Sequence, residues 1–172
     1  MQQIATLHRF HCAITAQRDN ANRFYRSCPA LSSTLFPLHS IHSHMPYLLK
    51  SEPDKYSFDD LLRDGETVWD GIKNAQALIT LRNMKRGEDC VIYHSNVGKA
   101  AVGTAKVVSV TTDPNDPKMP IVRLKAGKRL KREKPLAEIR EAPVFRGSLL
   151  FRQFRLSVVP LSEEQFDWLV HG

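Results

Sequence analysis

The sequence has few cysteines and no long apolar run. Its three cysteines, Cys12, Cys28 and Cys90, form no Cys-x-x-Cys pair, and no histidine lies at a spacing typical of zinc sites. This set indicates neither a disulfide framework nor a zinc cluster, and it favours a reducing compartment. No apolar run approaches the roughly 18 residues that a membrane span needs. We therefore expect a soluble protein without a membrane partner, cytoplasmic in location, nucleoid-associated in a bacterium and nuclear in a eukaryote.

Other absences concern catalysis. The sequence shows no acid/base pair, no phosphate-binding loop and no set of metal ligands, and an enzyme needs at least one of these. Aromatic residues are also unevenly spread, because residues 97–144 contain no Phe, Tyr or Trp. The lack of a catalytic set favours a binding protein over an enzyme, and no cofactor or metal is expected.

The charge is positive and the length is modest. Among 172 residues, 25 are Lys or Arg and 18 are Asp or Glu, which gives a formal net charge of +7. A hydrophobic content of 42% is enough for one ordinary core, so we expect one domain. An excess of cations favours approach to polyanions, nucleic acid first of all. The alternative is that the charge serves only solubility.

Residues 1–44 differ from the rest of the chain. They contain four arginines, no lysine, one acid and five histidines, in a Ser-containing context. The segment is interpreted as an N-terminal extension, disordered or non-native, because "MPYLLK" at residue 45 resembles a natural start. A targeting peptide is the alternative. The domain itself is predicted to cover residues 45–172.

Helices are predicted where a capping residue precedes an apolar pattern. Ser57 and Asp60 begin one helix that stops at Gly65, and Asn74 begins a second that ends near Lys85. Later helices are predicted in residues 135–141 and in residues 162–170, the last with a capping box.

Period-two patterns indicate strands between and after these helices. Gly103 permits a bulge or a sharp bend in one of them. Irregular alternation of strands with short helices favours an α+β fold, a small and mostly antiparallel β-barrel with helices packed around it, over a doubly wound sheet. The predicted strands cover residues 47–50, 89–95, 100–112, 121–130 and 154–161.

Four motifs carry a family resemblance. The segments "YLLKSEPDKYSFDDLLRDG", "VWDGIKNAQA", "MKRGEDCVIYHSN" and "FRQFRLSVVPLSEEQF" occur in the order and spacing of the EVE domain. The resemblance covers residues 46–169 and implies a PUA-like fold. It also implies a non-enzymatic pocket that accepts a nucleobase, with modified bases in DNA or RNA as favoured ligands. Many members of the family have aromatic residues near "KMPIVRL" and at the position of Ala75, so a full aromatic cage is not expected here.

Three residues of "VWDGIKN" suit such a pocket. Trp69 can stack on a flat base, which is worth about 1–3 kcal/mol per base, or it can belong to the core. Asn74 offers a donor and an acceptor to a base edge, or it serves only as the helix cap. Gly71 allows a ligand to approach the backbone closely.

The "KSEP" turn offers three polar groups at the end of a strand. Ser51 can bond a base edge, Lys50 can meet a phosphate, and Glu52 can accept from an exocyclic amine. The alternative is a simple turn, in which Pro53 sets the geometry and Ser51 satisfies local backbone groups.

The adjacent His94 and Ser95 do not form a nucleophile–base pair, because consecutive side chains of a strand point to opposite faces. Cys90 and His94 share a face but lie about 13 Å apart along a strand. The predicted base pocket comprises Lys50, Ser51, Glu52, Trp69, Asp70, Gly71, Asn74, Gln76, Tyr93, His94, Ser95, Asn96 and Gln153.

A basic segment, residues 123–134, can track phosphates or can be the solvated edge of a sheet. The predicted phosphate-binding residues are Lys125, Lys128, Arg129, Lys131, Arg132, Arg152 and Arg155.

The sequence therefore predicts a monomeric, non-enzymatic module that binds a modified or flipped nucleobase in DNA or RNA. A small enzyme acting on nucleic acid or a nucleotide, through His94 or Cys90, is the first alternative. A protein interaction module on the same scaffold is the second.

Overall fold

The computed structural model describes residues 44–172 of the chain. The predicted extension at 1–44 lies outside these residues except for His44, so its nature stays a prediction. No helix within the described part is long and apolar enough to span a membrane.

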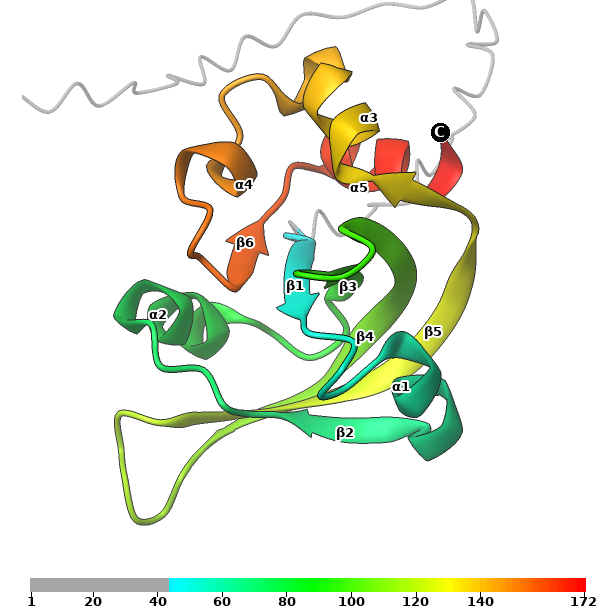
Figure 1. Ribbon diagram of the computed structural model, residues 1–172. Helices are drawn as coiled ribbons and strands as arrows, with labels where there is room; N and C mark the ends of the chain where they lie inside the picture. Colours follow the sequence, from blue (N-terminus) through cyan, green and yellow to red (C-terminus); the bar gives the residue numbers. More distant parts are fainter. Residues whose placement is uncertain (1–43) are drawn as a thin grey trace, which may run out of the picture. The chain divides into compact units, whose positions relative to one another are not determined.

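The centre of the fold is one six-stranded sheet (Figure 1). Its strand order is β2-β5-β4-β3-β1-β6, and every neighbouring pair is antiparallel except β1 and β3, which are parallel. The chain is therefore α+β with a mixed sheet, and closure of this sheet into a barrel stays a prediction. The strands are β1 (Tyr47–Ser51), β2 (Glu66–Trp69), β3 (Asp89–His94), β4 (Ala100–Thr112), β5 (Pro120–Pro135) and β6 (Val158–Pro160).

Short helices follow the caps that the sequence predicts. Ser57 accepts a hydrogen bond from the Asp60 amide while the Asp60 carboxylate accepts from Ser57, which completes a capping box for α1. Asn74 caps α2, which ends at Asn83, two residues before the predicted end near Lys85. The helices are α1 (Phe58–Asp64), α2 (Ala75–Asn83), α3 (Leu136–Glu141), a 3-10 turn (Pro143–Phe145), α4 (Leu149–Arg152) and α5 (Glu163–His171), where Ser162 and Gln165 form the second predicted capping box.

Besides the 3-10 turn, two elements were not predicted from the sequence. Strand β2 follows Gly65, whose positive φ of 73° ends α1 and turns the chain into the sheet. The four residues of α4 lie just before the last strand, which is shorter than predicted because only Val158–Pro160 pair with β1. Both elements are too short to give a clear periodicity.

Gly103 makes room for α1 on the sheet. The ladder between β4 and β5 changes register on both sides of this residue, as expected for a bulge. A Cβ atom at position 103 would overlap the ring of Phe58, which is fully buried. Helix α1 therefore packs closely over β4, and this contact fixes the loop between β1 and α1.

One cation of the basic segment is buried, against the expectation of a surface stripe. Only 2% of Lys134 is exposed, and its Nζ lies 4.7 Å from the centre of the Trp168 ring. The Gly172 carbonyl accepts a hydrogen bond from Nζ, and Glu138 lies 3.5 Å away. Lys134 thus attaches the end of β5 to α5 and is not available to phosphates.

Candidate nucleic-acid interface

A cavity of about 670 Å³ lies where β1, β2 and the loops next to them meet. The residues lining it that were predicted as site residues are Lys50, Ser51, Glu52, Trp69, Asp70, Gly71, Asn74 and Arg155. Those that were not predicted are Lys55, Tyr56, Thr67, Val68, Ile72, Lys73 and Ser157. Several of these unpredicted residues lie just after "KSEP" or just before Asn74. They could have been predicted from their closeness to these motifs.

Trp69 is the last residue of β2 and pairs with Val122 of β5. Its side chain is 8% exposed and lines both this cavity and a neighbouring one of about 450 Å³. The indole Nε1 is buried and has no hydrogen-bond partner among the described residues. An unpaired buried donor costs about 1–3 kcal/mol, so native proteins rarely keep one without a ligand or solvent to satisfy it.

The loop after Trp69 presents polar groups to the cavity. Gly71 has a positive φ of 72°, which an L side chain adopts only with strain, and it turns the chain toward α2. Asn74 caps α2, because its Oδ1 accepts a hydrogen bond from the Ala77 amide at 3.1 Å. This bond leaves the side-chain NH₂ of Asn74 as a donor, so capping and ligand binding are compatible.

The opposite side of the cavity is formed by the end of β1. Ser51 is buried and donates a hydrogen bond to the Tyr56 carbonyl, so its hydroxyl oxygen keeps acceptor capacity. Lys50 donates from Nζ to the Phe154 carbonyl at 2.9 Å, and burial lowers the pKa of this ammonium group. A Lys50 with this bond is already engaged before any phosphate arrives.

The ionised groups around the cavity are mostly cations. Glu52 forms an ion pair with Lys55 at 2.6 Å, so its predicted contact with an exocyclic amine competes with this pair. Both side chains are largely exposed, which makes the pair weak. The lining contains four cations, Lys50, Lys55, Lys73 and Arg155, against two carboxylates, Glu52 and Asp70. This balance suits a polyanion at the cavity mouth.

Six predicted pocket residues do not line the cavity. Gln76 lies exposed on α2, Gln153 lies exposed at the end of α4, and Asn96 lies exposed in the loop after β3. Ser95 donates a hydrogen bond to the Ser51 carbonyl at 3.0 Å, which holds the end of β1 in place. Tyr93 is buried in the core, and burial raises the pKa of its hydroxyl.

His94 also lies outside the cavity lining, at the end of β3. Its Nε2 accepts a hydrogen bond from the Phe58 amide at 3.1 Å, and burial lowers the pKa of the imidazole. The thiol of Cys90 is fully buried, and its pKa is raised, mainly by that burial. A raised pKa disfavours the reactive thiolate.

The predicted phosphate-binding residues separate into two groups. Arg129 is paired with Asp59 and lies over the Phe58 ring, and Arg132 forms two hydrogen bonds of 2.6 Å with Glu138. These guanidinium groups are already occupied by acidic partners. Residues that are exposed and have no acidic partner among the described residues are Lys125, Lys128, Lys131, Arg152 and Arg155. Their phosphate contacts stay a prediction.

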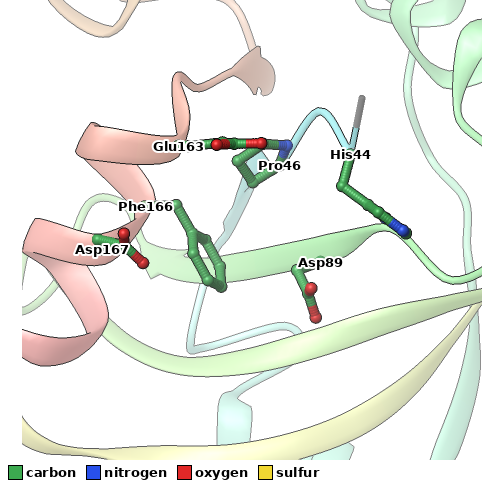
Figure 2. Close-up of a pocket in the computed structure, with 6 residues that line it drawn as sticks. All are labelled: His44, Pro46, Asp89, Glu163, Phe166 and Asp167. Atoms are coloured by element: carbon green, nitrogen blue, oxygen red, sulfur yellow. The ribbon is translucent and has the colours of Figure 1, made fainter. Parts of the chain in front are cut away.

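A smaller cavity of about 270 Å³ has the opposite character (Figure 2). Glu163, Phe166 and Asp167 of α5 line it together with Asp89 of β3, which forms an ion pair with Lys106 at 2.7 Å. Carboxylates repel a polyanion, so this cavity is no candidate for nucleic acid. No group of three or more His, Cys, Asp and Glu side chains in residues 44–172 could hold a metal ion.

Comparison with known proteins assigns the described part of the chain to a family. Residues 46–172 match the family model of the EVE domain. The chain belongs to the EVE domain family. The resemblance carried by the "KSEP", "WDG" and "YHS" motifs is thereby confirmed, and the cavity beside Trp69 lies within an EVE domain.

Relatives of this EVE domain include both eukaryotic and bacterial proteins. Human thymocyte nuclear protein 1 is 31% identical over 176 residues, which cover 81% of this chain and 77% of that protein. The crystal structure of Atu2648 from Agrobacterium tumefaciens has a TM-score of 0.70 and 30% identity, covering 73% of this chain and 90% of that one. The human THYN1 protein has been solved in complex with 5-methylcytosine-containing DNA. That structure has a TM-score of 0.66 and 31% identity, and the match covers 73% of this chain and 95% of that one.

Proposed function

We propose that this EVE domain binds a modified base of DNA, of the 5-methylcytosine class, in the cavity beside Trp69 and does not catalyse a reaction on it. The observation that carries the proposal is that Trp69, whose buried Nε1–H has no partner among the described residues, lines a cavity surrounded mostly by cations. The complex of human THYN1 with 5-methylcytosine-containing DNA supports it. A volume of about 670 Å³ is in the usual range for small-ligand sites.

Each part of a nucleotide has a matching group in the lining. The Trp69 Nε1–H and the Asn74 NH₂ are donors for the acceptors of a base edge, and Ser51 can accept from an amino group. Val68 and Ile72 offer apolar contact to a methyl group. Lys73 and Arg155 lie where cations can meet the phosphates that flank an extruded base.

A binding role is favoured over the enzymatic alternative by the state of the two candidate reactive groups. Cys90 is buried and its thiol has a raised pKa, and the Nε2 of His94 already accepts a hydrogen bond from the Phe58 amide. Neither side chain lines the cavity. A general base must lie within hydrogen-bond reach of the proton it removes, and these positions do not meet that condition.

Binding to three matched single-stranded oligonucleotides tests the proposal. They carry 5-methylcytosine, cytosine or an abasic site at one central position, and fluorescence anisotropy gives each dissociation constant. We expect the order 5-methylcytosine, cytosine, abasic from tightest to weakest. Trp69→Phe removes the indole donor while keeping an aromatic ring, so it should reduce the 5-methylcytosine-to-abasic ratio about three- to tenfold.

Lys128→Ala is the matched control, because it removes a surface charge away from the cavity. If Lys128 contacts a phosphate, all three oligonucleotides should weaken alike and the ratio should stay constant. Circular dichroism must show that Trp69→Phe is folded. Equal affinity of the wild-type protein for the 5-methylcytosine and abasic oligonucleotides would contradict a base pocket.

A further inference from the structure

Phe154 is a large apolar side chain that the fold leaves in solvent. It is 72% exposed, more than any other large hydrophobic residue in the described part of the chain. It lies in the segment that joins α4 to β6 (Figure 1). A ring in this position contributes little to the core, and its closeness to the cavity beside Trp69 is what makes it a candidate for contact with a ligand.

The turn that carries Phe154 is held firmly in place. The Leu156 amide donates to the Gln153 carbonyl at 2.8 Å, which closes a tight turn with Phe154 near its tip. Leu156 itself is 3% exposed and anchors the turn in the core. Such a turn presents the ring with a small loss of conformational entropy on binding.

The same turn is attached to the cavity beside Trp69. Lys50 holds it at two points, because its Nζ donates to the Phe154 carbonyl at 2.9 Å and its amide donates to the Ser157 carbonyl at 2.8 Å. Lys50, Arg155 and Ser157 all line the cavity. Phe154 does not line the cavity itself, but its chain neighbour Arg155 and its hydrogen-bond partner Lys50 both do.

We propose that Phe154 is a wedge that enters the base stack of duplex DNA and fills the space left by the base that moves into the cavity. The inference rests on the proposed base pocket and adds a duplex as the form of DNA that is recognised. Extrusion of a base breaks stacking and pairing, and apolar side chains inserted between base steps compensate for part of that cost.

Charge around Phe154 fits this role. The Arg155 guanidinium lies 5.6 Å from the centre of the Phe154 ring, and the exposed Arg152 lies two residues before Phe154. A wedge between bases is flanked by phosphates of the same strand, which neighbouring cations can neutralise. A protein partner with an apolar groove would not need these cations, so DNA is the better occupant.

Comparison of duplex and single-stranded DNA tests the wedge with the full-length protein. Both forms carry the same 5-methylcytosine, and binding is measured for the wild type, Phe154→Ala and Phe154→Leu. A single strand leaves no gap in a duplex stack, so only duplex binding should need the ring. Phe154→Ala should weaken duplex binding about tenfold and single-strand binding less than about twofold. Phe154→Leu keeps an apolar wedge and should lose less.

Because the Phe154 side chain is exposed, neither variant should unfold the protein. The hydrogen bond from Lys50 goes to the backbone carbonyl of residue 154, which both variants retain. Equal losses on duplex and single strand would overturn the wedge, because Phe154 would then be a stacking platform for unpaired bases. No loss on either form would overturn it as well. Failure of the base pocket is seen separately, as loss of the 5-methylcytosine-to-abasic ratio on single strands.

Discussion

At the scale of single residues, His94 acts as a hydrogen-bond acceptor for the start of α1. Its Nε2 accepts from the Phe58 amide, so the fold requires the neutral imidazole. Burial lowers the pKa of His94, against opposing contributions from Glu133 and Asp59, while Arg129 lowers it further. The bond therefore makes the position of α1 depend on the protonation state of His94, and so on pH.

This bond predicts a pH-dependent stability. Because the pKa in the fold lies below that of the unfolded chain, the contribution of His94 is complete above about pH 6.5 and is lost as pH falls from there through the folded pKa. His94→Gln can accept the same bond without titrating. Urea unfolding at pH 5 to 8 should show wild-type stability falling more steeply than that of the variant below about pH 6.5. Parallel curves would contradict this role.

Residue-level predictions from the sequence succeeded where the chemistry is local. Asn74 and Ser57 were predicted as caps because a cap needs only backbone amides two or three positions away. The burial of Lys134 could not be predicted, since it depends on Trp168, which is distant in the sequence. The absence of Tyr93 from the cavity lining likewise depends on which face of β3 meets the core.

At the scale of elements, the contact between α1 and β4 positions the cavity. Phe58 of α1 fills the space above Gly103, and the residues just before α1, Lys55 and Tyr56, form part of the cavity lining. A shift of α1 would therefore change the cavity. Close packing of a buried ring against a glycine leaves no room for an added methyl group.

Gly103→Ala should lower the free energy of unfolding by about 1–3 kcal/mol through overpacking. The same substitution in a Phe58→Leu background should cost less, because the smaller side chain leaves room for the methyl group. Chemical unfolding of the four proteins in this cycle should give a coupling energy above about 0.5 kcal/mol. Strictly additive effects would show that Phe58 and Gly103 do not compete for the same space.

The order of the strands in the sheet was harder to predict from the sequence than the strands themselves. Period-two patterns identified β3 and β4, but not the parallel pairing of β1 with β3. This pairing joins residues that are 43 positions apart in the sequence, with Leu48 opposite Val91 and Leu49 opposite Ile92. No local pattern specifies such a partner. The mostly antiparallel prediction was correct except for this one ladder.

At the scale of the whole molecule, charge is distributed unevenly between the described cavities. The lining beside Trp69 has four cations and two carboxylates, whereas the cavity at α5 contains Asp89, Glu163 and Asp167 (Figure 2). A net charge of +7 alone could not indicate where a polyanion binds. The motifs located the candidate pocket, and the fold added Ser157 to it, because only folding brings the segment before β6 beside β1.

The two tryptophans of the chain allow the most direct test of the pocket. Trp69 lines the cavity with an unpaired Nε1–H, whereas Trp168 packs edge-on against Phe145 at 5.6 Å and lines none of the described cavities. Each indole N–H gives its own signal in a ¹⁵N–¹H correlation spectrum, so one molecule carries both the reporter and its control. Substitution of Trp69 by Phe assigns the two signals.

The measurement is a titration with single-stranded DNA that carries one 5-methylcytosine, followed by the same titration with an abasic site at that position. The account predicts that the Trp69 indole signal moves with the methylated strand and stays in place with the abasic strand, while the Trp168 signal moves with neither. A methylated strand that binds to saturation without moving the Trp69 signal would contradict the account, because the base would then occupy another site.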